Sequence, residues 1–110
     1  MPLVQWSDSV VIAHLASEPQ FRDDMDAVEE VVARQKQVSV VLDFSGVGYL
    51  NSSNISHLLR LRKSMIASDG RLVLCSIDTR VWSTFLITGL DKVFEYADDV
   101  TTGLAMVQLT

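Results

Sequence analysis

The hydrophobic positions of the chain follow two different periods, and from residue 38 onward short apolar runs alternate with segments of helical spacing. The apolar runs predict strands at 38–44, 71–77 and 93–96. The segment after each run carries apolar residues three or four positions apart, which predicts helices that begin near residues 51, 78 and 98. Strands that alternate with helices in this way pair in parallel through right-handed crossovers.

The beginning of the chain predicts a hairpin and a helix. Apolar runs at 3–6 and 10–15 flank the turn residues 7–9, as in two antiparallel strands. After Pro19, apolar residues recur on one helical face at Phe21, Met25, Val28 and Val32. We therefore predict one α/β domain over residues 1–110, with a mixed sheet of four to five strands and helices packed on it.

The helix expected after residue 51 has apolar residues at Ile55, Leu58, Leu59, Met65 and Ile66. Its other side carries the basic cluster of Arg60, Arg62 and Lys63. We interpret the first set as the core-facing side and the basic cluster as a solvated face. Leu58 and Leu59 are therefore predicted to be buried, as are Leu42 and Leu74 in the strands. Gly70 is predicted to end this helix as residue C′.

The composition is that of one globular domain. The chain has 110 residues, of which 48% are apolar, so it can bury a core without a metal or a disulfide. Its single cysteine, Cys75, is predicted to be a small buried residue of a strand, with a reactive thiol as the alternative. A formal net charge of −5 argues against a nucleic-acid-binding surface, which is usually basic.

No early segment combines a basic start with an uninterrupted apolar run, and no segment reaches the length of a membrane span. We therefore expect a cytoplasmic protein that does not insert into a membrane.

Two adjacent hydroxyls, Ser52 and Ser53, stand where the third strand gives way to its helix. Such residues often cap helices, because a side-chain oxygen can accept an unpaired N–H group of the first turn. The same N–H groups and the helix dipole favour an anion, so a phosphate on either hydroxyl would lie in a favourable field. In parallel sheets, partners tend to meet the carboxyl ends of the strands, where Asp43 and this junction are expected. The local pattern leaves both simple capping and a functional surface open.

Catalytic and cofactor signatures are lacking in the sequence. His57 follows Ser53 by four positions and shares its helix face, but no nucleophile elbow surrounds the pair, which favours a surface contact. His14 is the only other imidazole, and no histidine or cysteine pair has metal-ligand spacing. Phosphate-loop and dinucleotide fingerprints are also missing. We predict a non-enzymatic protein with no metal site and no cofactor.

The order of several short segments resembles the STAS family, the anti-sigma factor antagonists. These segments are VVLDFSGV at 40–47, LNSSN at 50–54, LLRLRK at 58–63, DGRLVLC at 69–75 and ITGLDKVF at 87–94. The resemblance covers roughly residues 38 to 107. It implies the STAS fold, which agrees with the mixed sheet derived from the periodicity.

The family's usual phosphorylation pattern is Asp-Ser-Ser/Thr-Gly, and the hydroxyl directly after the Asp is the one modified. The resemblance therefore implies Ser52 as the phosphorylation site, with Ser53 as the alternative. The chain departs from the pattern at Asn51, where the family has Asp, and at Asn54, where it has Gly. Upstream, the stretch 14–18 is at best a remnant of the family's Gly-Glu-Leu-Asp segment.

The resemblance implies a bacterial regulator of transcription whose partner is an anti-sigma factor with serine kinase activity. Phosphorylation by this kinase would switch the regulator off. The residues expected to face this partner are Asp43, Asn51, Ser52, Ser53, Asn54 and His57. The alternative function is a STAS scaffold or transporter accessory subunit that is never phosphorylated, which the departures at Asn51 and Asn54 keep open. Self-association is left open as well.

Overall fold

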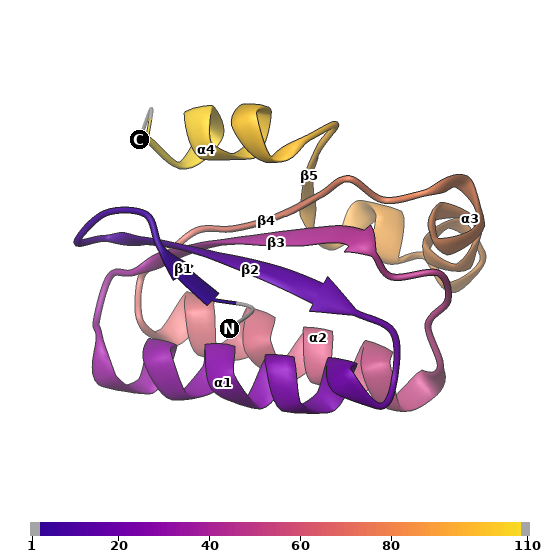
Figure 1. Ribbon diagram of the computed structural model, residues 1–110, viewed down its shortest axis with the longest axis horizontal. Coiled ribbons are helices and arrows are strands. Elements are labelled where there is room, and N and C mark those ends of the chain that lie inside the picture. Colours follow the sequence, from indigo (N-terminus) through magenta and orange to yellow (C-terminus); the bar gives the residue numbers. More distant parts are fainter. Residues whose placement is uncertain (1–2, 109–110) are drawn as a thin grey trace.

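Five strands form one mixed sheet, in the order in which they occur along the chain (Figure 1). The structure is a computed structural model that describes residues 3–108. β1 (Leu3–Gln5) pairs antiparallel with β2 (Val10–Ala16), and β3 (Ser39–Gly46), β4 (Leu72–Cys75) and β5 (Glu95–Ala97) continue the sheet in parallel. The predicted opening hairpin and the predicted mixed sheet are both confirmed.

Helices cover both faces of the sheet (Figure 1). α1 (Gln20–Arg34) and α2 (Ser52–Ala67) pack side by side on one face, and α4 (Val100–Gln108) lies on the other. α3 (Thr79–Thr88) and the short 3₁₀ helix η1 (Leu90–Lys92) follow the carboxyl end of β4. Because α1 and α2 each follow a parallel strand, both begin at the carboxyl ends of the strands.

The core has two parts because successive strand residues point to opposite faces. On the side of α1 and α2, the largest fully buried side chains include Phe21, Phe44, Leu42, Leu58 and Leu74. On the side of α4, the buried residues are Val10, Ile12, Val41, Val73, Cys75 and Val107. The predicted burial of Leu42, Leu58 and Leu74 is confirmed, and Cys75 is a buried strand residue as expected.

The predicted apolar face of α2 was partly wrong. Leu59 has 41% of its surface exposed and Ile66 has 63%, although both were assigned to the buried side. Leu61, which the sequence interpretation left out, is fully buried. The face that packs on the sheet is formed by Asn54, Leu58, Leu61 and Met65. A buried asparagine at the start of this row obscured the correct register, because polar residues are rarely placed on a core face.

The ends of the helices explain two of the glycines. Gly89 ends α3 in the left-handed conformation, with φ of 78°. At the end of α2 the left-handed residue is Asp69, with φ of 61°, so the assignment of Gly70 as the left-handed C′ residue was wrong. Gly70 is required for a different reason: a Cβ atom there would lie 2.0 Å from the carbonyl oxygen of Val38.

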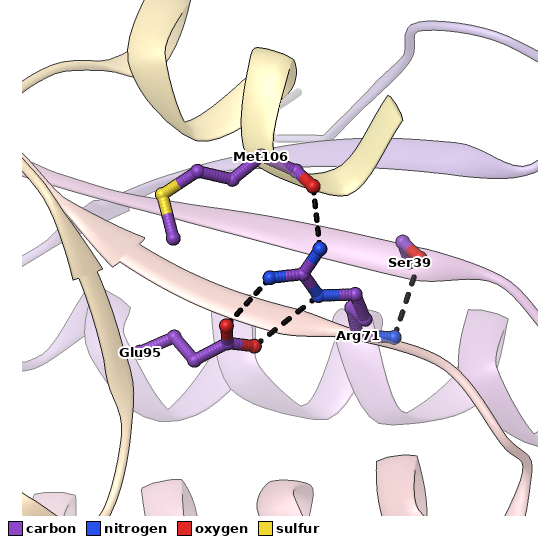
Figure 2. A network of polar contacts seen from close by, with 4 residues as sticks. All are labelled: Ser39, Arg71, Glu95 and Met106. Atoms are coloured by element: carbon purple, nitrogen blue, oxygen red, sulfur yellow. Dashed lines mark hydrogen bonds and ion pairs between the residues drawn. The ribbon is translucent and has the colours of Figure 1, made fainter. Parts of the chain in front are cut away.

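Arg71, directly before β4, joins three elements at the amino end of the sheet (Figure 2). Its guanidinium binds both carboxylate oxygens of Glu95 on β5, at 2.5 and 3.3 Å. It also donates to the carbonyl oxygen of Met106 on α4 at 2.5 Å. Its backbone N–H donates to Ser39 Oγ on β3 at 3.2 Å. These contacts fix the C-terminal part of α4 to the sheet.

Within residues 3–108, no helix is both long enough and apolar enough to cross a membrane.

Candidate functional site

The start of α2 is fixed by a reciprocal pair of hydrogen bonds between two asparagines. The Asn54 N–H donates to Asn51 Oδ1 at 2.8 Å, and the Asn51 N–H donates to Asn54 Oδ1 at 3.1 Å. Asn51 is therefore the N-cap residue, and the pair forms a capping box. Two of the four N–H groups that a helix start leaves without backbone partners are satisfied in this way.

Ser52 and Ser53 are the first two residues of α2, and both side chains are exposed. Neither serves as the cap, since Asn51 does. The capping box provides no acceptor for the backbone N–H groups of these two serines, which are the other two donors of the first turn. Both hydroxyls thus stand on the surface at a helix start that favours negative charge.

Asn54 also links α2 to the loop that precedes α1. Its side chain is 1% exposed, and Nδ2 donates to Glu18 Oε2 at 3.1 Å. The other oxygen of Glu18 accepts from the Arg22 N–H at 3.0 Å, in the first turn of α1. One carboxylate therefore joins the starts of both helices. The sequence interpretation missed Glu18 as a site residue, because its partner lies thirty-six positions away along the chain.

A second hydrogen bond joins the loop before α1 to the loop before α2. Ser17 Oγ accepts from the Gly48 N–H at 2.9 Å. The next residue, Tyr49, has 53% of its surface exposed beside the start of α2. The stretch 14–18, considered only a remnant of a family motif, in fact supports the loop that leads to Ser52.

Asp43 lies at the carboxyl end of β3, but it is 7% exposed and its carboxylate is occupied. Oδ2 lies 2.7 Å from His14 Nδ1, and Oδ1 accepts from the Ser45 N–H at 3.0 Å. Burial alone would raise the pKa of Asp43, but the bonds from Ser45 and His14 outweigh it and lower the pKa below its usual value. Asp43 is thus a supporting residue beneath the surface, while the His14 side chain is half exposed above it.

His57 makes a contact with Arg60 and not the predicted one with Ser53. Arg60 Nη2 lies 2.8 Å from His57 Nδ1, and Arg60 Nε donates to Glu29 Oε1 on α1 at 3.0 Å. Asp26, Glu29 and His57 bring side-chain ligand atoms within 4.8 Å of one another. The Arg60 guanidinium already contacts two of these three groups and supplies the positive charge that they attract.

The groups at this end of the sheet differ in their exposure and reactivity. Cys75 is buried opposite Asp43 in the next strand, and burial raises the pKa of its thiol to about 11, so it stays protonated at neutral pH. Its Sγ donates to the Leu42 carbonyl oxygen. The exposed groups are hydroxyls and amides at a helix start, which suit hydrogen bonding to a partner or the addition of a phosphate.

Comparisons with known proteins agree on the family. A STAS domain protein from Planctomyces limnophilus, described as an anti-sigma-factor antagonist, matches with a TM-score of 0.83 at 18% identity, covering 96% of each chain. An RsbS variant from Moorella thermoacetica matches with a TM-score of 0.82 at 15% identity, covering 97% of this chain and 93% of that one.

A chain from a structure of the stressosome, a signal integration and transduction hub, matches with a TM-score of 0.74 at 20% identity, covering 97% and 96% of the two chains. A search of curated proteins found no match. The sequence model of the STAS domain matches residues 8–103. The chain therefore belongs to the STAS domain family.

Proposed function

We propose that this protein is a non-enzymatic regulatory module of the anti-sigma factor antagonist type, which binds an anti-sigma kinase through the start of α2. The proposal is carried by one observation: Ser52 and Ser53 are exposed on the first turn of α2, with their N–H groups left over by the capping box. STAS antagonists act through protein partners, and the similar Planctomyces limnophilus and RsbS chains support that class. A cytoplasmic location follows from such a partner.

Phosphorylation of Ser52 is the proposed switch, with Ser53 as the alternative site. A phosphoserine adds about −1.5 to −2 charges. The start of α2 can accommodate this charge, because unpaired N–H groups and the helix dipole face it. The domain should therefore stay folded, and the added charge should act on the partner's surface.

A second candidate function is a structural STAS subunit that is never phosphorylated. It is favoured by Asn51 and Asn54, whose side chains bind each other and Glu18. Asn51 thus brings no carboxylate to the hydroxyl, and Asn54 fills a position where the family usually has glycine. The similarity to a stressosome chain fits such a role, which includes self-association.

The deciding experiment incubates the protein with ATP and an anti-sigma serine kinase, and measures the intact mass of the protein. We expect one added phosphate on the natural chain and none on Ser52→Ala, with Ser53→Ala as the matched control that stays modified. Modification of Ser52→Ala but not of Ser53→Ala would move the site to Ser53. A natural chain that stays unmodified would favour the structural subunit.

A further inference from the structure

The exposed side of α2 carries a regular row of residues that no part of the described chain covers. The row, here called the α2 ridge, consists of Ser52, Ser56, Leu59, Lys63 and Ile66, all exposed. Successive members lie four, three, four and three positions apart, which is the spacing of the seam in a coiled coil. Leu59 and Ile66 are exposed by 41% and 63% and stand one heptad apart.

Basic residues border the α2 ridge, although the whole chain carries a net charge of −5. Arg60, one of them, is paired with Glu29 of α1 at 3.0 Å. Arg60 and Arg62 occupy the two positions that flank a coiled-coil seam, where charged residues select the partner helix. Arg62 uses only Nε in its bond to the Val93 carbonyl oxygen, at 3.2 Å. Lys63 makes no ion pair with any residue from 3 to 108.

A hollow of about 230 Å³ opens along the C-terminal half of the α2 ridge. Its lining includes Arg62 and Ile66 of α2, together with Val93, Phe94 and Glu95. An apolar side chain that projects from a docked helix could enter this hollow next to Ile66. The surface therefore combines apolar anchors, a recess and a basic border.

We propose that the α2 ridge binds an amphipathic helix whose apolar seam is bordered by acidic residues. A second copy of this chain fits poorly, because pairing two α2 ridges face to face would bring Arg60, Arg62 and Lys63 against the same residues of the copy. The inference rests on the proposed function and deepens it. Ser52 is the first residue of the α2 ridge, so its phosphate would add negative charge where an acidic helix must lie.

The test uses the full chain labelled with ¹⁵N and two synthetic helical peptides of three heptads. Both have leucine at the seam, and one has glutamate and the other lysine at the flanking positions. We expect the glutamate peptide to shift amide resonances along the α2 ridge and to bind at least about tenfold more tightly than the lysine peptide. Equal affinity for both peptides, or shifts that map elsewhere, would overturn the proposal.

Two variants locate the contact. Leu59→Ser with Ile66→Ser should weaken the glutamate peptide at least about tenfold. The matched control, Leu86→Ser with Ile87→Ser, removes apolar residues of α3 that are 52% and 86% exposed and should leave the affinity unchanged. If the control weakens binding as much as the ridge variant does, the peptide binds the protein nonspecifically and the proposal fails.

Charge reversal provides a second readout that does not depend on removing apolar side chains. Arg62→Glu with Lys63→Glu should reverse the preference between the two peptides, and an unchanged preference would contradict the proposed border. The peptide titration needs no kinase. If the glutamate peptide fails to bind the unphosphorylated chain although a kinase can modify Ser52, this inference alone is rejected. If the peptide binds but no kinase modifies the chain, the switch alone is rejected.

Discussion

The two ends of the sheet are held in different ways. At the amino ends of the parallel strands, the backbone of Gly70 passes so close to the Val38 carbonyl that no side chain fits. Arg71 joins β4, β5 and α4 at the same end (Figure 2). At the carboxyl ends, side-chain bonds of Asn54, Glu18 and Ser17 support the start of α2, where the Ser52 and Ser53 hydroxyls remain exposed.

The two ends of the sheet should therefore differ in how well they tolerate substitutions. Close backbone packing tolerates almost no substitution, because a core at crystal-like density cannot absorb an extra atom without moving main chain. A helix start held by side chains loses about 1 kcal/mol when one bond is removed, and the fold survives. The carboxyl end can therefore vary more in sequence, whereas the amino end preserves the fold.

The sharpest test of this comparison is Gly70→Ala. The new Cβ atom would lie 2.0 Å from the Val38 oxygen and 2.9 Å from Met65 Cε. Because the oxygen belongs to the backbone, the ends of β3 and α2 must separate, and we expect a loss of more than about 5 kcal/mol or no folded protein. Urea unfolding followed by circular dichroism measures it.

Gly89→Ala is the control for that experiment. Nothing lies within 4 Å of its Cβ position, and only the φ of 78° is unfavourable for alanine. The expected loss is about 1 to 2 kcal/mol. If Gly70→Ala were no more destabilising than Gly89→Ala, the amino end would be more adaptable than we infer.

A second prediction concerns the two sides of α2, which runs between the two ends of the sheet. Leu58→Ala should cost about 2 to 5 kcal/mol, because Leu58 is fully buried. Leu59→Ala should cost less than about 1 kcal/mol, because Leu59 is 41% exposed. Equal shifts of the urea midpoint for both variants would show that the two sides of α2 do not differ as described.

The elements of the fold could be predicted because their periods are regular. The strands and helices were placed within a few residues of their observed bounds, including the start of α3 near residue 78. Local signals suffice for such features, since the residues that form them are neighbours in sequence. The buried face of α2 was harder to predict from the sequence, because it includes a polar residue, Asn54, whose partners are Asn51 and Glu18.

The site was predicted only in outline. The position of Ser52 at a helix start follows from sequence, but the support from Glu18 and Ser17 depends on loops that the sheet brings together. The same holds for Asp43, whose burial under His14 arises from the pairing of β2 with β3. No local pattern carries this information, because the contact is created by strand register.

A third prediction separates the cap from the adjacent hydroxyl. Asn51→Ala removes the acceptor for the Asn54 N–H and should cost about 1 to 2 kcal/mol. Ser52→Ala should change the free energy of unfolding by less than about 0.5 kcal/mol, because Ser52 is exposed and is not the cap. Thermal melts compare the two, and a larger loss for Ser52→Ala would mean that its hydroxyl supports the helix start.

A double substitution at the carboxyl end of the sheet tests the role of the family's Asp-Ser-Ser/Thr-Gly phosphorylation pattern. Asn51→Asp with Asn54→Gly restores that pattern and should raise the rate of phosphorylation by the cognate kinase. The change also removes the bond from Asn54 to Glu18, so the variant should be less stable than Asn51→Asp alone. Affinity for the unmodified partner should stay within about tenfold of the natural chain. An unchanged phosphorylation rate would show that these two positions do not limit the switch.

The smallest expected effect is the pH dependence at Asp43. The pKa of Asp43 is lowered in the folded protein from the usual 3.8. Between 3.8 and the lowered pKa, the folded state therefore binds fewer protons than the unfolded state. The stability from Asp43 is therefore present above pH 3.8 and lost as the pH falls through the lowered value. We expect it to stay below about 1 kcal/mol, because His14 is half exposed to solvent.

Asp43→Asn isolates this contribution from those of other carboxylates, since it keeps the shape of the side chain and removes its titration. Urea midpoints of the natural chain and the variant should differ most near neutral pH and converge as the solution is acidified below pH 3.8. A difference that stays constant over the whole acid range would mean that Asp43 acts through packing alone. In that case the carboxyl end would depend less on charge, and more on close packing, than its hydrogen bonds imply.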